Sequence, residues 1–291
     1  MEVDVILVSG ATGLIGRHLL RQLGEAGTPA RAFVRDPARG EALGCEFVVG
    51  DFDRPDSVAA ALAGVDRLFL NTSAGPSLVR QQTDAIDAAR AAGVRQIVKV
   101  SVQDAAPTAG LARGWHGEIE EHLRRSGVPW AVLRPNGFMQ NFLGDAADIA
   151  EGGQFFGAYG DGAIAHVDCR DIAGCAAALL TRPIGDDETF VLTGPEGLTH
   201  DDIAARFSAT LGRHIRYVDL TPEAMSGRLI DRYGLPAGMA TEAVETMAYL
   251  ASGAWGSPTT AVADLTGRAP HTFDDFLADH IDAFRPPVTG N

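Results

Sequence analysis

Short apolar runs alternate with longer amphipathic segments over the first 135 residues of the chain. The apolar runs are rich in β-branched residues and mostly lack polar alternation, as strands buried on both faces of a parallel sheet do. We predict strands at 3–8, 30–34, 46–49, 67–70, 96–100 and 130–134, and helices at 14–24, 55–63, 77–92 and 115–126. Because strand–helix repetition implies right-handed crossovers, this pattern predicts an α/β fold built on a doubly wound parallel sheet.

The rhythm changes after residue 134. Residues 136–156 mix glycine, phenylalanine and asparagine without a clear period, whereas 171–180 again predicts a helix and 190–192 a seventh strand. Further helices are predicted at 199–211, 222–233, 241–252 and 273–284, with a strand at 215–220. We therefore expect a core of residues 1–135 to which 160–194 returns, and a smaller, mainly helical C-terminal substrate lobe of 136–159 and 195–285. The tail 285–291, with two prolines and a glycine, is expected to be frayed.

A glycine-rich turn joins the first predicted strand to the first predicted helix. Its sequence is Gly10-Ala-Thr-Gly13-Leu-Ile-Gly16, with GxxGxxG spacing. Gly10 permits a tight turn, Gly13 lets the backbone approach a pyrophosphate, and Gly16 allows close packing of helix on strand. A helix N-terminus directly behind such a turn offers free N–H groups to an anion. The context of strand, turn and helix predicts a Rossmann-type dinucleotide site.

A cation stands at the end of the second predicted strand. Arg35 occupies the place where an acidic residue would bind the ribose hydroxyls of NAD, and a cation there suits the 2′-phosphate of NADP. Asp36 follows directly, so a surface ion pair between the two is the alternative interpretation. We predict NADP(H) as the cofactor, with NAD less favoured.

Polar residues also follow the third and fourth predicted strands. Asp51 can accept a hydrogen bond from an adenine amino group, and Phe52 can flank the ring. Asp53 stands before Arg54-Pro55 and is predicted to cap the next helix. The backbone after the fourth strand is expected to line the cofactor, at Asn71, Thr72 and Ser73.

Motifs along nearly the whole chain carry a resemblance to a known family. They lie at 10–16, 34–37, 50–70, 91–101, 133–142, 168–174 and 192–199. In these segments the chain resembles the NmrA-like group of atypical short-chain dehydrogenases. The group resembles both NADPH-dependent reductases and redox-sensing regulators that bind the cofactor without turnover, so its motifs indicate nucleotide binding and leave the reaction open.

The resemblance places the family's active-site serine on Ser101. The Tyr-x-x-x-Lys pair of ordinary members should fall on 112–123, and aligning Glu120 puts the lysine on His116 and the tyrosine on Ala112. The usual proton donor is therefore absent, and we predict Ser101 and His116 as the catalytic residues. Helical spacing places His116 on the buried stripe with Ile119. It can donate a proton, hold a ribose hydroxyl or orient a substrate; a packed histidine paired with Glu120 is the structural alternative.

The resemblance also implies that the segment 135–138 lies beside the nicotinamide. With it, the predicted cofactor-binding residues are Gly10, Thr12, Gly13, Leu14, Ile15, Gly16, Arg35, Asp51, Phe52, Asn71, Thr72, Ser73, Val100, Pro135, Asn136, Gly137 and Phe138. An aromatic wall follows it, and an apolar wall with few polar anchors is typical of a small-molecule pocket. The predicted substrate-binding residues are Phe138, Asn141, Phe142, Phe156, Tyr159 and His166, although each aromatic residue among them also suits a core position.

Composition narrows the classes of partner. The net charge of −14 disfavours nucleic acid, since nucleic-acid binders usually present a basic face. The three cysteines have no metal-finger or disulfide spacing, and no apolar run approaches the length of a membrane span. An acidic N-terminus, Glu2 and Asp4, is unlike a signal peptide. We expect a cytoplasmic protein without a metal, whose partner is a small molecule; the oligomeric state stays open.

These observations predict an NADPH-dependent oxidoreductase acting on a small aromatic, quinone or enone-like substrate. Acceptors of this kind need little acid from the protein, which suits the missing tyrosine. An NAD(P)-sensing NmrA-like regulator, which would bind a protein partner and catalyse nothing, is the first alternative. Non-redox chemistry on the same scaffold, such as isomerisation or dehydration, is the second.

Overall fold

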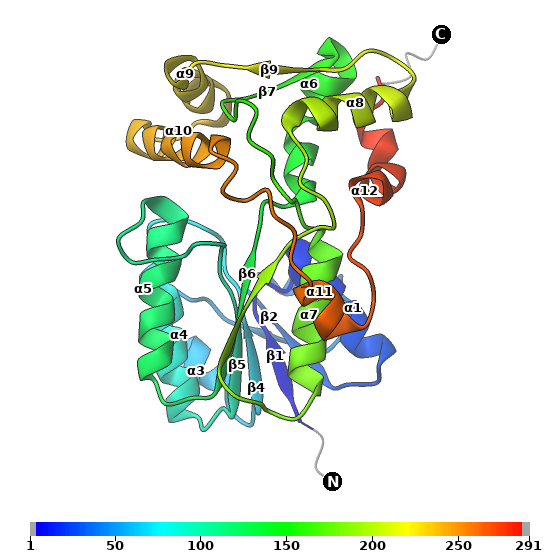
Figure 1. The fold of residues 1–291 in the computed structure, drawn as a ribbon. Coiled ribbons are helices and arrows are strands. Elements are labelled where there is room, and N and C mark those ends of the chain that lie inside the picture. The colour runs from blue at the N-terminus through cyan, green and yellow to red at the C-terminus, as the bar shows by residue number, and fades with distance from the viewer. Residues whose placement is uncertain (1–3, 287–291) are drawn as a thin grey trace. The chain divides into compact units, whose positions relative to one another are not determined.

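The computed structural model describes residues 4–286, and its main feature is a seven-stranded parallel sheet (Figure 1). The strands are β1 (Ile6–Val8), β2 (Ala30–Val34), β3 (Phe47–Val49), β4 (Arg67–Leu70), β5 (Gln96–Val100), β6 (Trp130–Pro135) and β8 (Glu188–Leu192). Their order is β3-β2-β1-β4-β5-β6-β8, so the chain reverses direction across the sheet between β1 and β4. Ligands of such sheets bind outside the carboxyl ends of the strands at this switch point. The predicted doubly wound parallel sheet is confirmed.

Two layers of helices cover the sheet (Figure 1). On one face lie α3 (Pro55–Ala61), α4 (Leu78–Ala91) and α5 (Leu111–Arg125); on the other lie α1 (Leu14–Glu25), α7 (Cys169–Thr181) and α11 (Ala261–Thr266). Helix α5 begins four residues earlier than the sequence predicts, at Leu111. The stripe that predicts its buried face is confirmed, since Ile119 and Leu123 are both 0% exposed.

The sequence pattern missed helix α2 (Pro37–Glu41). Asp36 is its N-cap and accepts a hydrogen bond from the backbone N–H of Ala38 at 3.0 Å, while Pro37 occupies the first turn. Aspartate before proline is a common start of a helix, so the signal was present in the sequence. The carboxylate of Asp36 therefore serves the helix end rather than pairing with Arg35.

The described residues divide into two compact units. The first comprises 4–135, Cys169–Leu192 and Ala261–Arg268; the second comprises Asn136–Asp168, Thr193–Thr260 and the rest of the described chain from Ala269. These boundaries differ from the expected ones. The returning segment begins at Cys169 rather than at 160, and α11 joins the first unit because it packs on α7. The predicted first residue of β1, Val3, and the tail residues 287–291 lie outside the described chain.

The second unit is mainly helical. Its elements are η1 (Met139–Asp145), α6 (Ala146–Gly152), β7 (Gln154–Gly157), α8 (His200–Leu211), β9 (Arg216–Asp219), α9 (Pro222–Tyr233), α10 (Ala237–Ala251), α12 (Phe273–His280) and η2 (Ile281–Phe284). Strand β7 pairs in parallel with β9, and capping boxes open α8 at Thr199 and α12 at Thr272. Its core is built from phenylalanine rings, among them Phe155, Phe207 and Phe276. The segment 136–156 shows no period because its elements are too short to display one.

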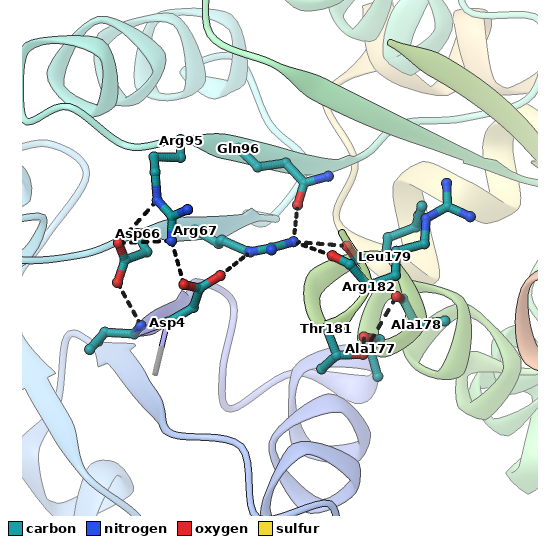
Figure 2. A network of polar contacts seen from close by, with 11 residues as sticks. Asp4, Asp66, Arg67, Arg95, Gln96, Ala177, Ala178, Leu179, Thr181 and Arg182 are labelled. Carbon is teal, nitrogen blue, oxygen red and sulfur yellow. Dashed lines mark hydrogen bonds and ion pairs between the residues drawn. The ribbon is translucent and has the colours of Figure 1, made fainter. Parts of the chain in front are cut away.

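A buried arginine ties together the amino ends of the central strands (Figure 2). Arg67, the first residue of β4, donates to Asp4 at 2.8 Å, to Gln96 at the start of β5 at 2.8 Å, and to the carbonyl oxygen of Arg182 after α7 at 2.9 Å. Arg95 pairs with the same Asp4. Because the network lies at the opposite edge of the sheet from the glycine turn, its role is to hold the strands and α7 together.

Candidate functional site

The glycine turn after β1 is shaped by close backbone contacts. Gly10 has φ +61°, and a Cβ at this position would lie 2.8 Å from the carbonyl oxygen of Asn71. A Cβ at Gly16 would lie 2.3 Å from the carbonyl oxygen of Gly10, so α1 begins in direct contact with the turn. Gly13 is different, because a Cβ there would meet only Gly10 O, at 3.2 Å. Close packing thus requires glycine at positions 10 and 16. At position 13 the packing within the chain does not by itself explain why the residue is glycine.

Helix α1 presents its N-terminus uncapped. Gly13 is the N-cap residue, no side chain caps the helix, and the first turn contains no acidic residue. The backbone N–H groups of this turn and the positive end of the helix dipole can therefore serve an anion such as a pyrophosphate.

A cavity of about 270 Å³ lies at the carboxyl edge of the sheet, where β1, β2, β3 and β4 end. It brings together most of the residues predicted to bind the nucleotide: Gly10, Thr12, Arg35, Asp51, Phe52, Asn71, Thr72 and Ser73. Gly13 and Leu14 are exposed beside it, and Ile15 and Gly16 are buried under it. The shape and lining of this cavity fit the adenosine half of a dinucleotide, which the uncapped α1 would hold by its phosphates.

Arg35 is the available cation of this cavity. Its side chain is exposed, and it forms no ion pair with any residue between 4 and 286. Asp36 caps α2 and lies 4.0 Å from Arg39. The surface pair of Arg35 with Asp36, the alternative left open by the sequence, is therefore wrong.

Asp53 does not cap helix α3, so that prediction is wrong. The N-cap residue is Arg54, which makes no capping hydrogen bond. Asp53 instead accepts hydrogen bonds from Gln81 and Arg80 of α4, and both bonds hold the pKa of its carboxyl below the usual value. Its neighbour Asp51 accepts from the backbone N–H of Asp53 at 3.0 Å and remains part of the cavity wall.

Ser101, the first residue after β5, belongs to a buried polar cluster. Its hydroxyl donates to Glu120 Oε1 at 2.6 Å, and Arg134 donates to both oxygens of the same carboxylate, at 3.0 and 2.7 Å. Burial raises the pKa of Glu120, but the hydrogen bonds from Arg134 and Ser101 outweigh it, and the pKa lies below the usual value. The hydroxyl proton of Ser101 is therefore donated to the buried carboxylate of Glu120.

His116 is partnered by a residue that the sequence analysis missed. Lys99 Nζ, fully buried in β5, lies 2.8 Å from His116 Nδ1 and donates to the carbonyl oxygen of Val100 at 3.0 Å. The structural alternative of a pair between His116 and Glu120 is wrong. When Lys99 is an ammonium group it can only donate, so Nδ1 accepts and the ring proton resides on Nε2.

Burial lowers the pKa of Lys99 to about 7. Burial and the nearby Lys99 charge lower the pKa of His116 well below its usual 6.5. His116 is therefore a neutral imidazole at pH 7 with Nε2–H as a hydrogen-bond donor, and Lys99 is the group that titrates near neutrality. A lysine inside the apolar run Gln96–Val100 was the available sequence signal.

The segment after β6 is held by its own backbone and side chains. Asn136 donates through Nδ2 to the carbonyl oxygen of Trp255 at 2.8 Å and accepts from the N–H of Gly137 at 2.6 Å, so both ends of its amide are engaged within the second unit. Phe138 is half-buried and pairs by its backbone with Val167. Val100 and Pro135 are buried in the first unit. Whether this segment contacts a nicotinamide stays a prediction.

The second unit contains a cavity of its own, of about 250 Å³. It brings together five of the predicted substrate residues: Asn141, Phe142, Phe156, Tyr159 and His166. Phe138 is not part of its wall. The sequence analysis missed His200, which lines the cavity and stacks on Tyr159 with ring centroids 4.2 Å apart and planes at 5°. In the sequence, His200 directly follows the cap residue Thr199, and this position does not indicate that its side chain lines a cavity.

Residues 4–286 contain neither a metal-ligand cluster nor a membrane-spanning helix. No group of three or more histidine, cysteine, aspartate or glutamate side chains in that range could hold a metal ion, and no helix in it is long and apolar enough to cross a bilayer. The three cysteines are free thiols.

Known proteins resemble this chain along most of its length. A family model described as NAD(P)H-binding matches residues 10–183. The NAD(P)H azoreductase of Xenophilus azovorans is 36% identical over 288 residues, covering 96% of this chain and 99% of that protein. The (4-alkanoyl-5-oxo-2,5-dihydrofuran-3-yl)methyl phosphate reductase of Streptomyces griseus is 35% identical over 286 residues, covering 97% of this chain and 100% of that protein.

A solved structure gives the same result. The NADPH-dependent quinone oxidoreductase from Escherichia coli, crystallised with NADPH, aligns with a TM-score of 0.86 at 28% identity, covering 95% of this chain and 99% of that chain. Sequence, fold and glycine turn agree: the chain belongs to the NAD(P)H-binding family, as its resemblance to the atypical short-chain dehydrogenases predicts.

Proposed function

We propose that this chain is an NADPH-dependent oxidoreductase that reduces quinones and related conjugated acceptors. The observation that carries the proposal is the cavity at the switch point of the sheet, with an uncapped helix behind a glycine turn and the unpaired cation Arg35 on its wall. The relatives point to the acceptor. Their names contain an azo compound, an unsaturated lactone and a quinone, and each of these has a conjugated, electron-poor double bond.

The nucleotide would be held by the first unit. The N–H groups at the start of α1 and the turn at Gly13 would bind the pyrophosphate, and Arg35 would bind the 2′-phosphate that distinguishes NADP from NAD. Asp51 and Phe52 would receive the adenine. Arg35 is exposed and unpaired, so a phosphate would meet it without first displacing an anionic partner of the chain.

When bound, NADPH supplies a hydride, and the acceptor takes up a proton as well to complete a two-electron reduction. The chain itself would supply hydrogen bonds to the ligands and hold them in position. As an ammonium group, Lys99 would fix the tautomer of His116, so the neutral imidazole would offer Nε2–H as a donor, either to a carbonyl oxygen that gains negative charge or to a ribose hydroxyl. Ser101 donates a hydrogen bond to Glu120, and Arg134 donates to the same carboxylate. Through these bonds Ser101 would position the carboxyl end of β5.

NADPH oxidation measured against a panel of quinones, unsaturated lactones and azo compounds tests the proposal. We expect turnover with at least one class, and much slower turnover with NADH. Tight NADPH binding without turnover on any member of the panel would overturn it in favour of the cofactor-sensing regulator.

Two glycine variants provide the matched control. Gly13→Val should abolish NADPH binding while the protein stays folded, because its Cβ meets only one atom, at 3.2 Å. Gly16→Val should lower stability, because its Cβ would lie 2.3 Å from Gly10 O. Unchanged NADPH affinity of Gly13→Val by calorimetry would refute the assignment of the phosphate site.

A further inference from the structure

The cavity of the second unit is walled by fixed aromatic rings. His200 stacks on Tyr159 and also contacts the ring of Tyr217, at 4.9 Å and 34°. Phe142 packs edge-on against Phe155 at 5.9 Å and 87°. Because these contacts fix each ring by its neighbours, the cavity is a preformed slot that suits a flat ring.

Two buried histidines in this wall, His166 and His200, each have an Nδ1 atom without a hydrogen-bond partner between residues 4 and 286. His200 is 4% exposed, and neither ring nitrogen hydrogen-bonds to another residue between 4 and 286; Nδ1 is also fully buried. Burial and the neighbouring His166 lower the pKa of His200 to about 3, so the imidazole is neutral at pH 7. Nδ1 is out of reach of a ligand, whereas Nε2 is not fully buried and has no partner, so Nε2 is the atom at which a ligand could supply the missing hydrogen bond. A neutral imidazole has one N–H, which suits a carbonyl oxygen.

The cation in the wall of this cavity, Arg228, is already compensated by a carboxylate, as is Arg232, which lies outside the wall. Arg228 pairs with Asp148 and lies over the ring of Phe156 at 3.9 Å, and Arg232 pairs with the same Asp148 at 3.1 Å. Asp145 is the other charged residue of the wall, and burial together with Asp148 raises its pKa to about 6, so it is mostly ionised at pH 7. Two arginines thus face two carboxylates. An anionic ligand would find no free cation and would meet Asp145.

The size of the cavity sets the size of the ligand. An apolar cavity of about 150 Å³ holds one benzene ring. The volume of about 250 Å³ leaves room for a second, fused ring.

Building on the proposed function, we propose that this cavity recognises the acceptor, that it selects an uncharged, flat, fused two-ring quinone over anionic acceptors, and that His200 holds one carbonyl oxygen of the ligand. His200 is then a residue that determines specificity, and the pair of Arg228 with Asp148 is what excludes anions.

Binding measured without turnover tests this selection. The probe is 2,3-dimethyl-1,4-naphthoquinone, whose substituted ring resists addition of thiols, titrated by calorimetry into the full chain saturated with NADP⁺. Its 6-sulfonate is compared with the 6-methylsulfone, which has a similar shape and no charge. We expect the sulfone to bind at least tenfold more tightly than the sulfonate. Equal binding of the two would overturn the charge selection.

Two variants locate the effect. Asp148→Asn leaves Arg228 and Arg232 without their carboxylate and should tighten sulfonate binding at least fivefold, while the sulfone changes less than twofold. His200→Phe keeps a stacking ring, removes both nitrogens and should weaken binding of the parent quinone three- to tenfold, with NADP⁺ affinity unchanged and the melting temperature not lowered. His214→Phe, at an exposed position of the same unit, is the matched control and should change nothing.

The outcomes separate this inference from the proposed function. Parent quinone binding that is the same in wild type and His200→Phe overturns the role of His200, even if NADPH is oxidised. Selective binding without NADPH oxidation supports the quinone site and refutes the oxidoreductase. Should His200→Phe not fold, the wild-type comparison of sulfone with sulfonate and the Asp148→Asn variant still decide.

Discussion

Replacing Lys99 with methionine tests the buried pair that sets the state of His116. Methionine has a similar length and no charge, so Lys99→Met removes the ammonium group from the core and also its hydrogen bonds to His116 and to the carbonyl of Val100. Two lost hydrogen bonds cost roughly 1–3 kcal/mol together. That loss does not depend on pH, whereas the effect of the buried charge does.

The sign of the pH effect follows from the shifted pKa. Burial lowers the pKa of Lys99 from 10.5 to about 7. Between these two values the unfolded chain holds a proton that the folded chain does not, so the stability of the wild type rises with pH through this window and stops depending on Lys99 below about 7. Each pKa unit corresponds to about 1.4 kcal/mol, and the full cost of the buried charge is about 5 kcal/mol at low pH.

Urea denaturation of wild type and Lys99→Met at pH 7 and pH 9 measures this effect. We expect the free energy of unfolding of the wild type, relative to the variant, to rise by about 2 kcal/mol between the two pH values, because nearly two pKa units lie inside the window and Lys99 is half protonated at its lower end. Contributions of other groups cancel in the difference. A difference that does not change with pH would refute the conclusion that burial lowers the pKa of Lys99 and leaves its side chain neutral in the fold near pH 8.

Three further predictions concern single side chains. Arg35→Ala should weaken NADPH binding by roughly 1.5–3 kcal/mol and NADH binding hardly at all, by calorimetry; equal losses would make Arg35 structural. His116→Ala should lower kcat about tenfold, as loss of one neutral hydrogen bond does. A loss of roughly 10²–10⁴ would instead indicate a general acid, against the lowered pKa. Arg67→Met should lower the free energy of unfolding by about 3–5 kcal/mol, because Gln96 Oε1 and two carbonyl oxygens lose their donor while Asp4 keeps only Arg95; a change below 1 kcal/mol would show that the network in Figure 2 is dispensable.

The sequence predicted the sheet well because its central strands are buried on both faces. The strands at 30–34, 67–70 and 96–100 have the predicted ends, since an unbroken apolar run has few alternative structures. The cavity at the switch point was predictable for a related reason. Its residues follow strand ends directly, and parallel strands bring their carboxyl ends to one edge.

What the sequence did not give depends on tertiary contacts. The role of Lys99 depends on its contact with His116, which lies on a helix 17 residues further along the chain. The role of His200 depends on stacking against Tyr159, which belongs to a different segment of the second unit. Asp53 shows the converse: its local sequence is that of a cap, but Arg80 and Gln81 on α4 compete successfully for its carboxylate.

The discontinuous make-up of the first unit has a consequence for synthesis and truncation. Strand β6 pairs with β8, and α7 contacts both α1 and α11, so the unit is assembled from three stretches of chain that end at Arg268. A ribosome-bound chain released up to Pro135 has an unpaired edge at β6 and lacks α7 and α11 on one face of the sheet, and unpaired edges invite aggregation. The nucleotide-binding unit therefore cannot be completed until more than nine-tenths of the 291 residues have emerged, and the fragment 1–135 is not a minimal binding module.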